Sequence, residues 1–352
     1  MNNNSENFFR WMFRQKDELN SIVFLFISRV NANNARFIPL FQNTQKIRII
    51  YLSGLPIRYS DKFSMKIFKL LQVLFSSKIG RYQIIHFFDV EMSFKNHSQV
   101  LHIDDPIYSN DYLQKIKVWE LNNHVKGFAS KTITTNTFTA DWLRKNVNLS
   151  KIIIIEQGFH DLNFNQKSLS KSFICGYSSP YINYGKDKNS GHPTYGAEIL
   201  INEIIPQLYI KDPEIEIHLI GKLGKHARKE LERYPHILLF GRTNFSENMK
   251  ILKNCSIGIY PRKTDNKRSV LKIFTYLGAG LPIVTFDSID TEIVERLKVG
   301  FSVKNSTQFV EKVLELKQSN KVLKHFQINI KKIREQYSWQ SLAIKMESLL
   351  SE

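Results

Sequence analysis

Short apolar runs alternate along this chain with stretches whose apolar residues recur at helical spacing. The runs predict strands at 21–27, 46–52, 82–88, 99–103, 132–135 and 151–155, and then at 173–177, 214–220, 236–240, 257–260, 281–286 and 300–303. The amphipathic stretches predict helices at 61–78, 111–123, 137–147, 194–210, 225–233, 246–254, 268–279 and 306–317, and from 320 onward. Because continuous apolar runs indicate strands that are covered on both faces, the pattern predicts an α/β protein with parallel sheets.

The alternation occurs in two series, separated by a polar segment without a period at residues 161–172. We therefore expect two doubly wound, Rossmann-like domains, with limits at 1–165 and 166–325, followed by closing helices over 326–352. In such sheets, ligands bind beyond the carboxyl ends of the strands. Two domains of this kind would face each other across an interdomain cleft.

Composition narrows the class of protein. With 42% hydrophobic residues among 352, the chain is not a disordered protein, and two cysteines exclude a disulfide scaffold and zinc-binding spacing. No apolar run is long enough to span a bilayer and no leader is evident, so we expect a cytoplasmic protein. The net charge of +18 suits nucleic acid, anionic lipid or phosphate-bearing small molecules, or reflects only a Lys-rich genome composition.

Two segments carry the candidate chemistry. Lys272 lies early in the predicted helix 268–279, where free N–H groups and the positive end of the helix dipole favour phosphate, although it could equally be a surface lysine. The acid/base candidates lie at the end of the predicted strand 99–103: His102 is within the strand, and Asp104 and Asp105 follow it. Strand alternation places His102 and Asp104 on one side and Asp105 on the other. Alternatively, the two carboxylates open a turn before Pro106.

Basic and apolar residues also alternate in two stretches that suit a membrane surface. Phe8–Arg14 mixes aromatic residues with Arg, and the predicted helix 62–78 carries Lys62, Lys66 and Lys69 beside an apolar stripe. An ordinary helix with a solvated Lys face explains the second pattern equally well.

Residues 268–284 resemble the donor-binding motif of GT-B glycosyltransferases, especially family 4. The resemblance rests on Lys-Ile-Phe-Thr-Tyr at 272–276 and Gly-Leu-Pro-Ile-Val at 280–284. Further pieces occur in the family's order at 82–86, 100–104, 154–158, 239–243, 255–261 and 337–339, so the similarity extends over roughly residues 80–345.

The resemblance implies a GT-B fold with an acceptor-binding first domain, a nucleotide-sugar-binding second domain and C-terminal helices that return to the first. It implies a metal-independent Leloir hexosyltransferase without a cofactor. This enzyme would move a sugar from a nucleotide-sugar to a glycan or lipid-linked acceptor in bacterial-type surface polysaccharide or glycolipid synthesis. An anionic membrane surface is a candidate partner, at the inner membrane face, and nucleic acid is not expected. A GT-B-like nucleotide-sugar epimerase and a basic nucleic-acid-binding protein remain as alternatives.

The resemblance also implies roles for individual residues. Asp104 or Asp105 would be the base of an inverting enzyme, whereas His102 would contact the donor sugar in a retaining one. The chain departs from the family where Thr275 replaces a Glu, where Lys267 lies eight residues before it, and where Tyr177 and Tyr195 replace an Arg and a Lys. Diphosphate contacts are therefore expected from Lys272, Arg262 and Arg268, with Lys186 or Lys188 as further candidates. The complete predicted donor-binding set is Lys272, Arg262, Arg268, Arg242, Thr243, Tyr276, Gly176 and Tyr177.

Overall fold

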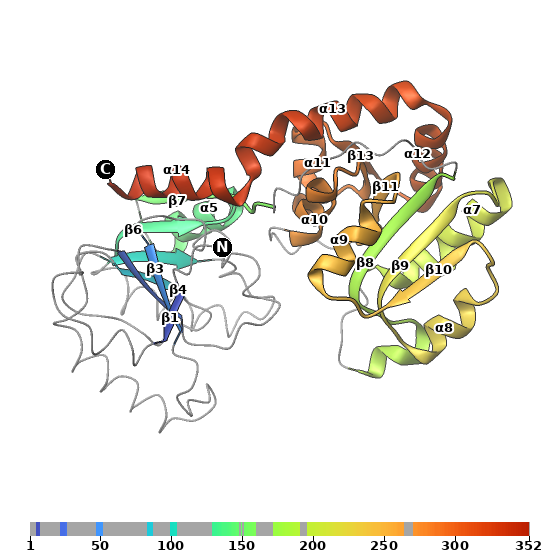
Figure 1. The fold of residues 1–352 in the computed structure, drawn as a ribbon, viewed down its shortest axis with the longest axis horizontal. Helices are drawn as coiled ribbons and strands as arrows, with labels where there is room; N and C mark the ends of the chain where they lie inside the picture. The colour runs from blue at the N-terminus through green and yellow to red at the C-terminus, as the bar shows by residue number, and fades with distance from the viewer. Residues whose placement is uncertain are drawn as a thin grey trace. The chain divides into compact units, whose positions relative to one another are not determined.

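In a computed structural model, the chain forms two compact units (Figure 1). Met1–Gly158 and Tyr337–Glu352 belong to the first unit, and Phe159–Asn266 and Val270–Gln336 belong to the second. The structure describes residues 129–147, 149, 151–159, 172–190, 196–263 and 270–351, together with strands at 5–7, 22–26, 47–51, 83–86 and 99–103.

The first unit is built on a seven-stranded sheet with the order β1-β3-β2-β4-β5-β6-β7, in which every described pair is parallel. The strands are β1 (Ser5–Asn7), β2 (Ile22–Phe26), β3 (Ile47–Tyr51), β4 (Gln83–His86), β5 (Gln99–Ile103), β6 (Ala129–Thr134) and β7 (Ile152–Ile154). Strand β5 lies between β4 and β6, so its carboxyl end lies within the row of strand ends and not at the sheet's margin.

Helix α5 (Thr137–Val147) follows β6 directly, and its sequence explains its start. The side chain of Asn136 accepts a hydrogen bond from the Thr139 N–H at 2.8 Å, which satisfies one of the amide groups left free at a helix N-terminus. Helix α14 (Trp339–Ser351) belongs to the same unit. The Tyr337 hydroxyl donates to the Glu156 carboxylate at 2.7 Å, and the Trp339 ring packs so closely on Gly158 that a Cβ there would lie 2.7 Å from it.

The second unit has a six-stranded parallel sheet with the order β10-β9-β8-β11-β12-β13. The strands are β8 (Ile174–Ile182), β9 (Glu216–Leu223), β10 (Ile237–Gly241), β11 (Ile257–Tyr260), β12 (Ile283–Phe286) and β13 (Gly300–Val303). The chain builds outward from β8 in one direction and then, from β11, in the other. This is the Rossmann order, and its switch point between β8 and β11 is where such sheets bind ligands.

Helices cover both faces of this second sheet. They are α6 (Ala197–Ile199), α7 (Ile205–Lys211), α8 (Lys225–Leu231), α9 (Phe245–Leu252), α10 (Leu271–Ala279), α11 (Glu292–Arg296), α12 (Ser306–Gln318) and α13 (Asn320–Tyr337), with short 3-10 turns at Gly185–Ser190 and Ile289–Thr291. Helices α6 and α7 form one continuous run through a π-helical segment, Leu200–Ile204. Pro206 lies just after this segment and has no N–H to continue the regular α-helical ladder.

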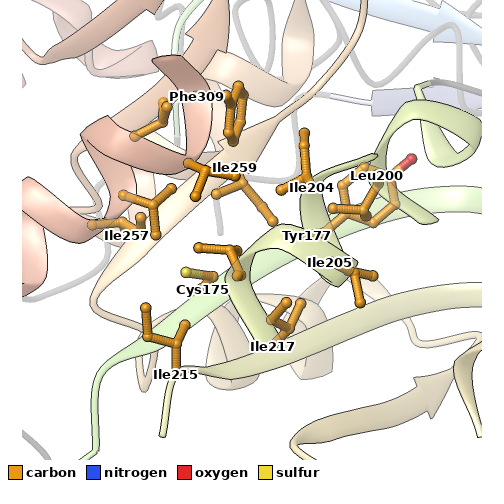
Figure 2. Packing of buried hydrophobic residues seen from close by; sticks show 14 of the residues in the cluster. Cys175, Tyr177, Leu200, Ile204, Ile205, Ile215, Ile217, Ile257, Ile259 and Phe309 are labelled. Atoms are coloured by element: carbon orange, nitrogen blue, oxygen red, sulfur yellow. The ribbon is translucent and has the colours of Figure 1, made fainter. Parts of the chain in front are cut away.

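The core of the second unit lies between the central strands and the helices that follow β8 and β13 (Figure 2). Alternate residues of β8, β9 and β11 point to this layer, among them Cys175, Ile217 and Ile257, all fully buried. Ile204 and Phe309 meet them from the helical side. Each such side chain contributes about 1.5–3 kcal/mol of transfer free energy, so this layer is the main source of the unit's stability.

The predicted α/β fold class with two doubly wound parallel sheets is confirmed. Each predicted strand is present, and β8 extends to Ile182, beyond the predicted end at 177, because the strand continues through a register shift between Ser178 and Tyr181. The predicted helices at 61–78 and 111–123 lie outside the described residues, and so does the segment Phe8–Arg14. The assignment of acceptor and donor binding to residues 1–165 and 166–325, and of 326–352 to closing helices, stays a prediction.

A candidate anion-binding site at the switch point of the second sheet

Lys272 lies at the switch point, in the first turn of α10, beside the carboxyl end of β11 and the middle of β8. The side chain as a whole is half-buried, but its ammonium nitrogen, Nζ, is buried from solvent. Nζ lies over two aromatic rings, 5.7 Å from the Tyr177 centroid and 5.9 Å from the Tyr260 centroid. The amine end of this lysine therefore points inward, so the alternative of an ordinary surface lysine is wrong.

The electrostatics of this position favour an incoming anion. Burial lowers the pKa of Lys272 well below its ordinary value, and the positive charge of Arg262 lowers it further. Arg262 follows β11 and is half-buried. Lys272 of α10 and Arg262 after β11 thus disfavour each other's positive charge in the ligand-free protein. An anion bound beside them would lower the free-energy cost of holding both charges there.

A helix N-terminus lies against the loop that follows β11, at Pro261 and Arg262. Gly196, which precedes the continuous helical run 197–211, has φ +85°, and a Cβ there would lie 2.2 Å from the Pro261 carbonyl oxygen and 2.9 Å from the Arg262 amide nitrogen. Only glycine tolerates both the backbone conformation and this approach. The amide groups at the start of the run therefore lie beside Arg262, where they add to the positive potential.

Tyr276, which the sequence placed in the donor-binding set, positions the strands at this site. Its hydroxyl donates to the Ile259 carbonyl at 3.1 Å and accepts from the Ser178 N–H at 3.1 Å, so it connects the end of β11 to the middle of β8. The ring is fully buried and lies on Gly258, where a Cβ would be 2.6 Å from it. The Tyr276 hydroxyl is thus engaged by backbone groups of the two strands that frame the site.

Tyr276→Phe is expected to destabilise the protein. The change leaves the Ser178 N–H and the Ile259 carbonyl buried without this partner, at a cost of roughly 1–3 kcal/mol for each group. Urea unfolding followed by circular dichroism measures the loss. Tyr184→Phe, which removes an exposed hydroxyl bonded to Asn202, is the matched control and is expected to change stability by less than about 1 kcal/mol. Equal stability of Tyr276→Phe and the wild type would contradict the positioning role.

Gly176 and Tyr177 lie in the middle of β8 and serve packing. A Cβ at Gly176 would meet the Cys255 sulfur at 2.9 Å and the Leu252 side chain at 3.0 Å, so the glycine allows α9 to approach the sheet. Tyr177 is fully buried in the core, with its ring beneath the Lys272 ammonium. The predicted direct contact of these two residues with the donor stays a prediction.

Arg242 and Thr243 follow β10, at the same carboxyl edge of the sheet but two strands away from β8. The register sets Gly241 level with Ser178 of β8, so strand spacing places the end of β10 on the order of 10 Å from the middle of β8. Gly241, with φ +68°, makes the turn, and Asn244 and Glu247 form a reciprocal capping box that starts α9. Arg242 is exposed and Thr243 half-buried, so both are accessible to a ligand that extends along this edge.

Sequence reasoning missed several residues that frame the site, namely Tyr260, Gly196 and Asp187. The Asp187 carboxylate, in the loop after β8, accepts the N–H groups of His226 at 3.3 Å and Ala227 at 3.0 Å, and so anchors that loop to the start of α8. The positions of Gly196 and Tyr260 depend on contacts between distant segments, for which the sequence offers no signal.

The candidate residues of the first unit are only partly covered. His102 lies in β5, paired in register with His86 of β4, and the backbone alone is described there. Asp104, Asp105 and Arg268 lie outside the described residues, and so do Tyr195, Lys267 and Asp89. Thr275 is described, and its hydroxyl donates to the Leu271 carbonyl of its own helix at 3.0 Å.

Within the ranges that the structure covers, no three His, Cys, Asp or Glu side chains are arranged to hold a metal ion. Across the same ranges, no helix combines the length and apolar content needed to cross a bilayer.

Comparison with known proteins agrees with this geometry. Residues 189–319, which contain Gly196, Arg262 and Lys272, match the model of the family described as glycosyl transferases group 1. An uncharacterized glycosyltransferase of Methanocaldococcus jannaschii is 25% identical over 256 residues, which cover 66% of this chain and 65% of that protein. The chain has the GT-B glycosyltransferase fold.

Two solved GT-B structures illustrate the extent of the similarity. Staphylococcus aureus TarM, solved with fondaparinux, α-GlcNAc-glycerol and UDP, gives a TM-score of 0.61 at 17% identity and covers 80% of this chain and 58% of its own. Anabaena HepE, solved with UDP and glucose, gives 0.66 at 12% identity and covers 94% and 99%. At these identities the likeness concerns the fold. This chain spans less than two thirds of the curated relative, and the specific resemblance to family 4 stays a prediction.

Proposed function

We propose that this protein is a Leloir glycosyltransferase that transfers a sugar from a nucleotide-sugar donor to a glycan or lipid-linked acceptor. The observation that carries the proposal is the buried Lys272 ammonium beside Arg262 at the switch point of the second sheet. It lies within the segment that matches the group 1 family. A nucleotide diphosphate is the leaving group of such a transfer, and its charge must be offset as the glycosidic bond breaks.

The described residues suit this task. Lys272 and Arg262 lie where the donor's diphosphate would bind, and the helix that starts after Gly196 directs amide groups toward the same loop. The nucleoside would extend along the carboxyl edge toward Arg242 and Thr243. Basic side chains and helix amides can stabilise a leaving diphosphate electrostatically. We therefore propose transfer without a metal ion.

The acceptor side of the proposal depends on the first unit. A carboxylate after β5, Asp104 or Asp105, would take the proton of the acceptor hydroxyl in an inverting reaction. His102 would contact the donor sugar in a retaining one. The products would be glycans or glycolipids of the surface-polysaccharide type, made on the inner face of a membrane.

A thermal-shift screen of nucleotide-sugars tests the donor site. A donor at one hundred times its Kd is expected to stabilise the folded protein by about 2.7 kcal/mol, because it binds the native state alone. The shift should persist in excess EDTA. An effect that disappears with EDTA and returns with manganese would contradict the metal-independent proposal, and the absence of any shift across UDP-, GDP-, ADP- and dTDP-sugars would contradict donor binding. Product analysis of the stabilising donor without acceptor then separates transfer from epimerisation, because an epimerase changes the donor by itself.

A further inference from the structure

Exposed apolar side chains gather at the open edge of the second sheet. Strand β10 is the edge strand and pairs only with β9 among the described strands. Leu238 is 45% exposed, Phe240 40% and Phe245 52%, all within eight residues of chain. We call these three side chains the β10 rim. Large apolar side chains that are exposed together indicate an interaction surface, whereas single ones do not.

The β10 rim lies on one face of the sheet. The register pairs Leu238 with His218 of β9, so the two side chains point to the same face, and the Phe240 ring centroid lies 5.0 Å from that of His218. Helix α9 covers this face farther in, where Leu252 approaches Gly176. Phe245 is the first residue of the same helix. The rim therefore lies at the part of this sheet face that α9 no longer covers.

Cations surround the rim. Arg242, between Phe240 and Phe245 in the chain, and Lys250, farther along α9, are both exposed. Lys222, also exposed, lies at the end of β9 close to Arg242, because the register pairs Gly241 with Ile220. Two described carboxylates also lie close to the rim. Glu247 accepts the Asn244 N–H, and Glu216 of β9, one-third exposed, lies 3.6 Å from His218 Nε2. With three exposed cations against these two carboxylates, the surroundings of the apolar side chains carry a net positive charge.

We propose that the β10 rim docks on an anionic lipid surface. Apolar side chains enter the boundary between headgroups and acyl chains, and nearby Lys and Arg side chains are attracted to anionic headgroups. A second copy of this chain is the less suitable occupant. A twofold contact places the same patch against itself, and Lys222, Arg242 and Lys250 would then face their own like charges. The proposal concerns location and does not depend on the transfer reaction.

Vesicle sedimentation of the full chain tests the proposal without donor. The wild type is expected to bind vesicles of phosphatidylcholine and phosphatidylglycerol in equal parts, and to bind pure phosphatidylcholine weakly. The charge variant Lys222→Gln/Arg242→Gln/Lys250→Gln should lose about 100-fold in affinity, since each basic residue near the surface contributes roughly a factor of five. The apolar variant Leu238→Ser/Phe240→Ser/Phe245→Ser should lose at least tenfold, with its fold verified by circular dichroism.

Ile210→Ser, which alters a side chain that is 81% exposed outside the rim, is the matched control and should bind as the wild type does. The proposal is overturned if the wild type ignores anionic vesicles, if the charge variant binds them unchanged, or if sedimentation equilibrium shows a dimer that the apolar variant dissociates. A donor-induced melting shift in a protein that does not bind vesicles would leave the proposed function intact, so the two failures are distinguishable.

Discussion

Lys272→Met is expected to lower kcat/KM about 30- to 1,000-fold and to raise the stability of the ligand-free protein. The kinetic loss corresponds to roughly 2–4 kcal/mol of transition-state stabilisation, the contribution of one well-placed charge at a developing anion. The gain in stability has a separate cause. Methionine keeps most of the stem's volume but removes an amine whose charge is disfavoured by burial and by Arg262. Steady-state kinetics and urea unfolding of the same preparation measure both effects.

The control for this variant is Lys312→Met. Lys312 also lies over an aromatic ring, 4.5 Å from the Phe301 centroid, but it belongs to α12 and bonds Glu315. It should change kcat/KM less than threefold. Unchanged turnover in Lys272→Met would remove this lysine from the site, and a large loss of stability would show that its amine supports the fold.

The lowered pKa of Lys272 also predicts opposite pH dependences for stability and donor binding. Between that pKa and the ordinary value of 10.5, the unfolded state binds more protons than the folded state, so the stability of the ligand-free protein rises with pH. A bound diphosphate favours the protonated amine, so donor affinity falls over the same range. Both trends should disappear in Lys272→Met, which calorimetry and unfolding at several pH values can establish.

The second large effect is expected at the end of β5. If the reaction inverts, Asp104→Asn or Asp105→Asn should reduce kcat roughly 100- to 10,000-fold with donor affinity nearly unchanged, because Asn keeps the shape of the side chain and removes its basicity. We expect one of the two to carry the effect, since the alternation of an extended chain predicts that adjacent side chains point to opposite sides. The unaffected member of the pair is then the matched control.

A retaining reaction gives a different pattern. Neither Asn variant should then lose as much, and His102→Ala should show the largest loss through weaker contact with the donor sugar. Rate and donor affinity for the three variants, with the stereochemistry of the product determined by NMR, separate the outcomes. Wild-type behaviour in all three would exclude the end of β5. His86, the last residue of β4, and Asp89, which follows that strand, would be tested next.

The sequence by itself determined the fold class and the place of Lys272 in the second unit. Short runs rich in apolar and β-branched residues, bounded by polar or glycine-containing segments, are typical of strands covered on both faces, so β11 and β12 were readable without tertiary information. Glycine and proline determined the end of α10 in the same local way, because Gly280 adopts the left-handed conformation, φ +79°, that closes the helix. Lys272 was identifiable from its place in the first turn of that helix.

Only the tertiary structure decided what these residues do. Whether the Lys272 side chain points to water or inward depends on the rings of Tyr177 in β8 and Tyr260 in β11, over which no local sequence pattern could place it. The predicted contact residue Tyr276 uses its hydroxyl to hold β8 and β11 together, a role set by backbone groups 98 and 17 residues away. Such contacts join segments that are distant in the chain. Local propensity specifies each strand and helix, but the burial of a charge is a property of the neighbours that packing brings around it.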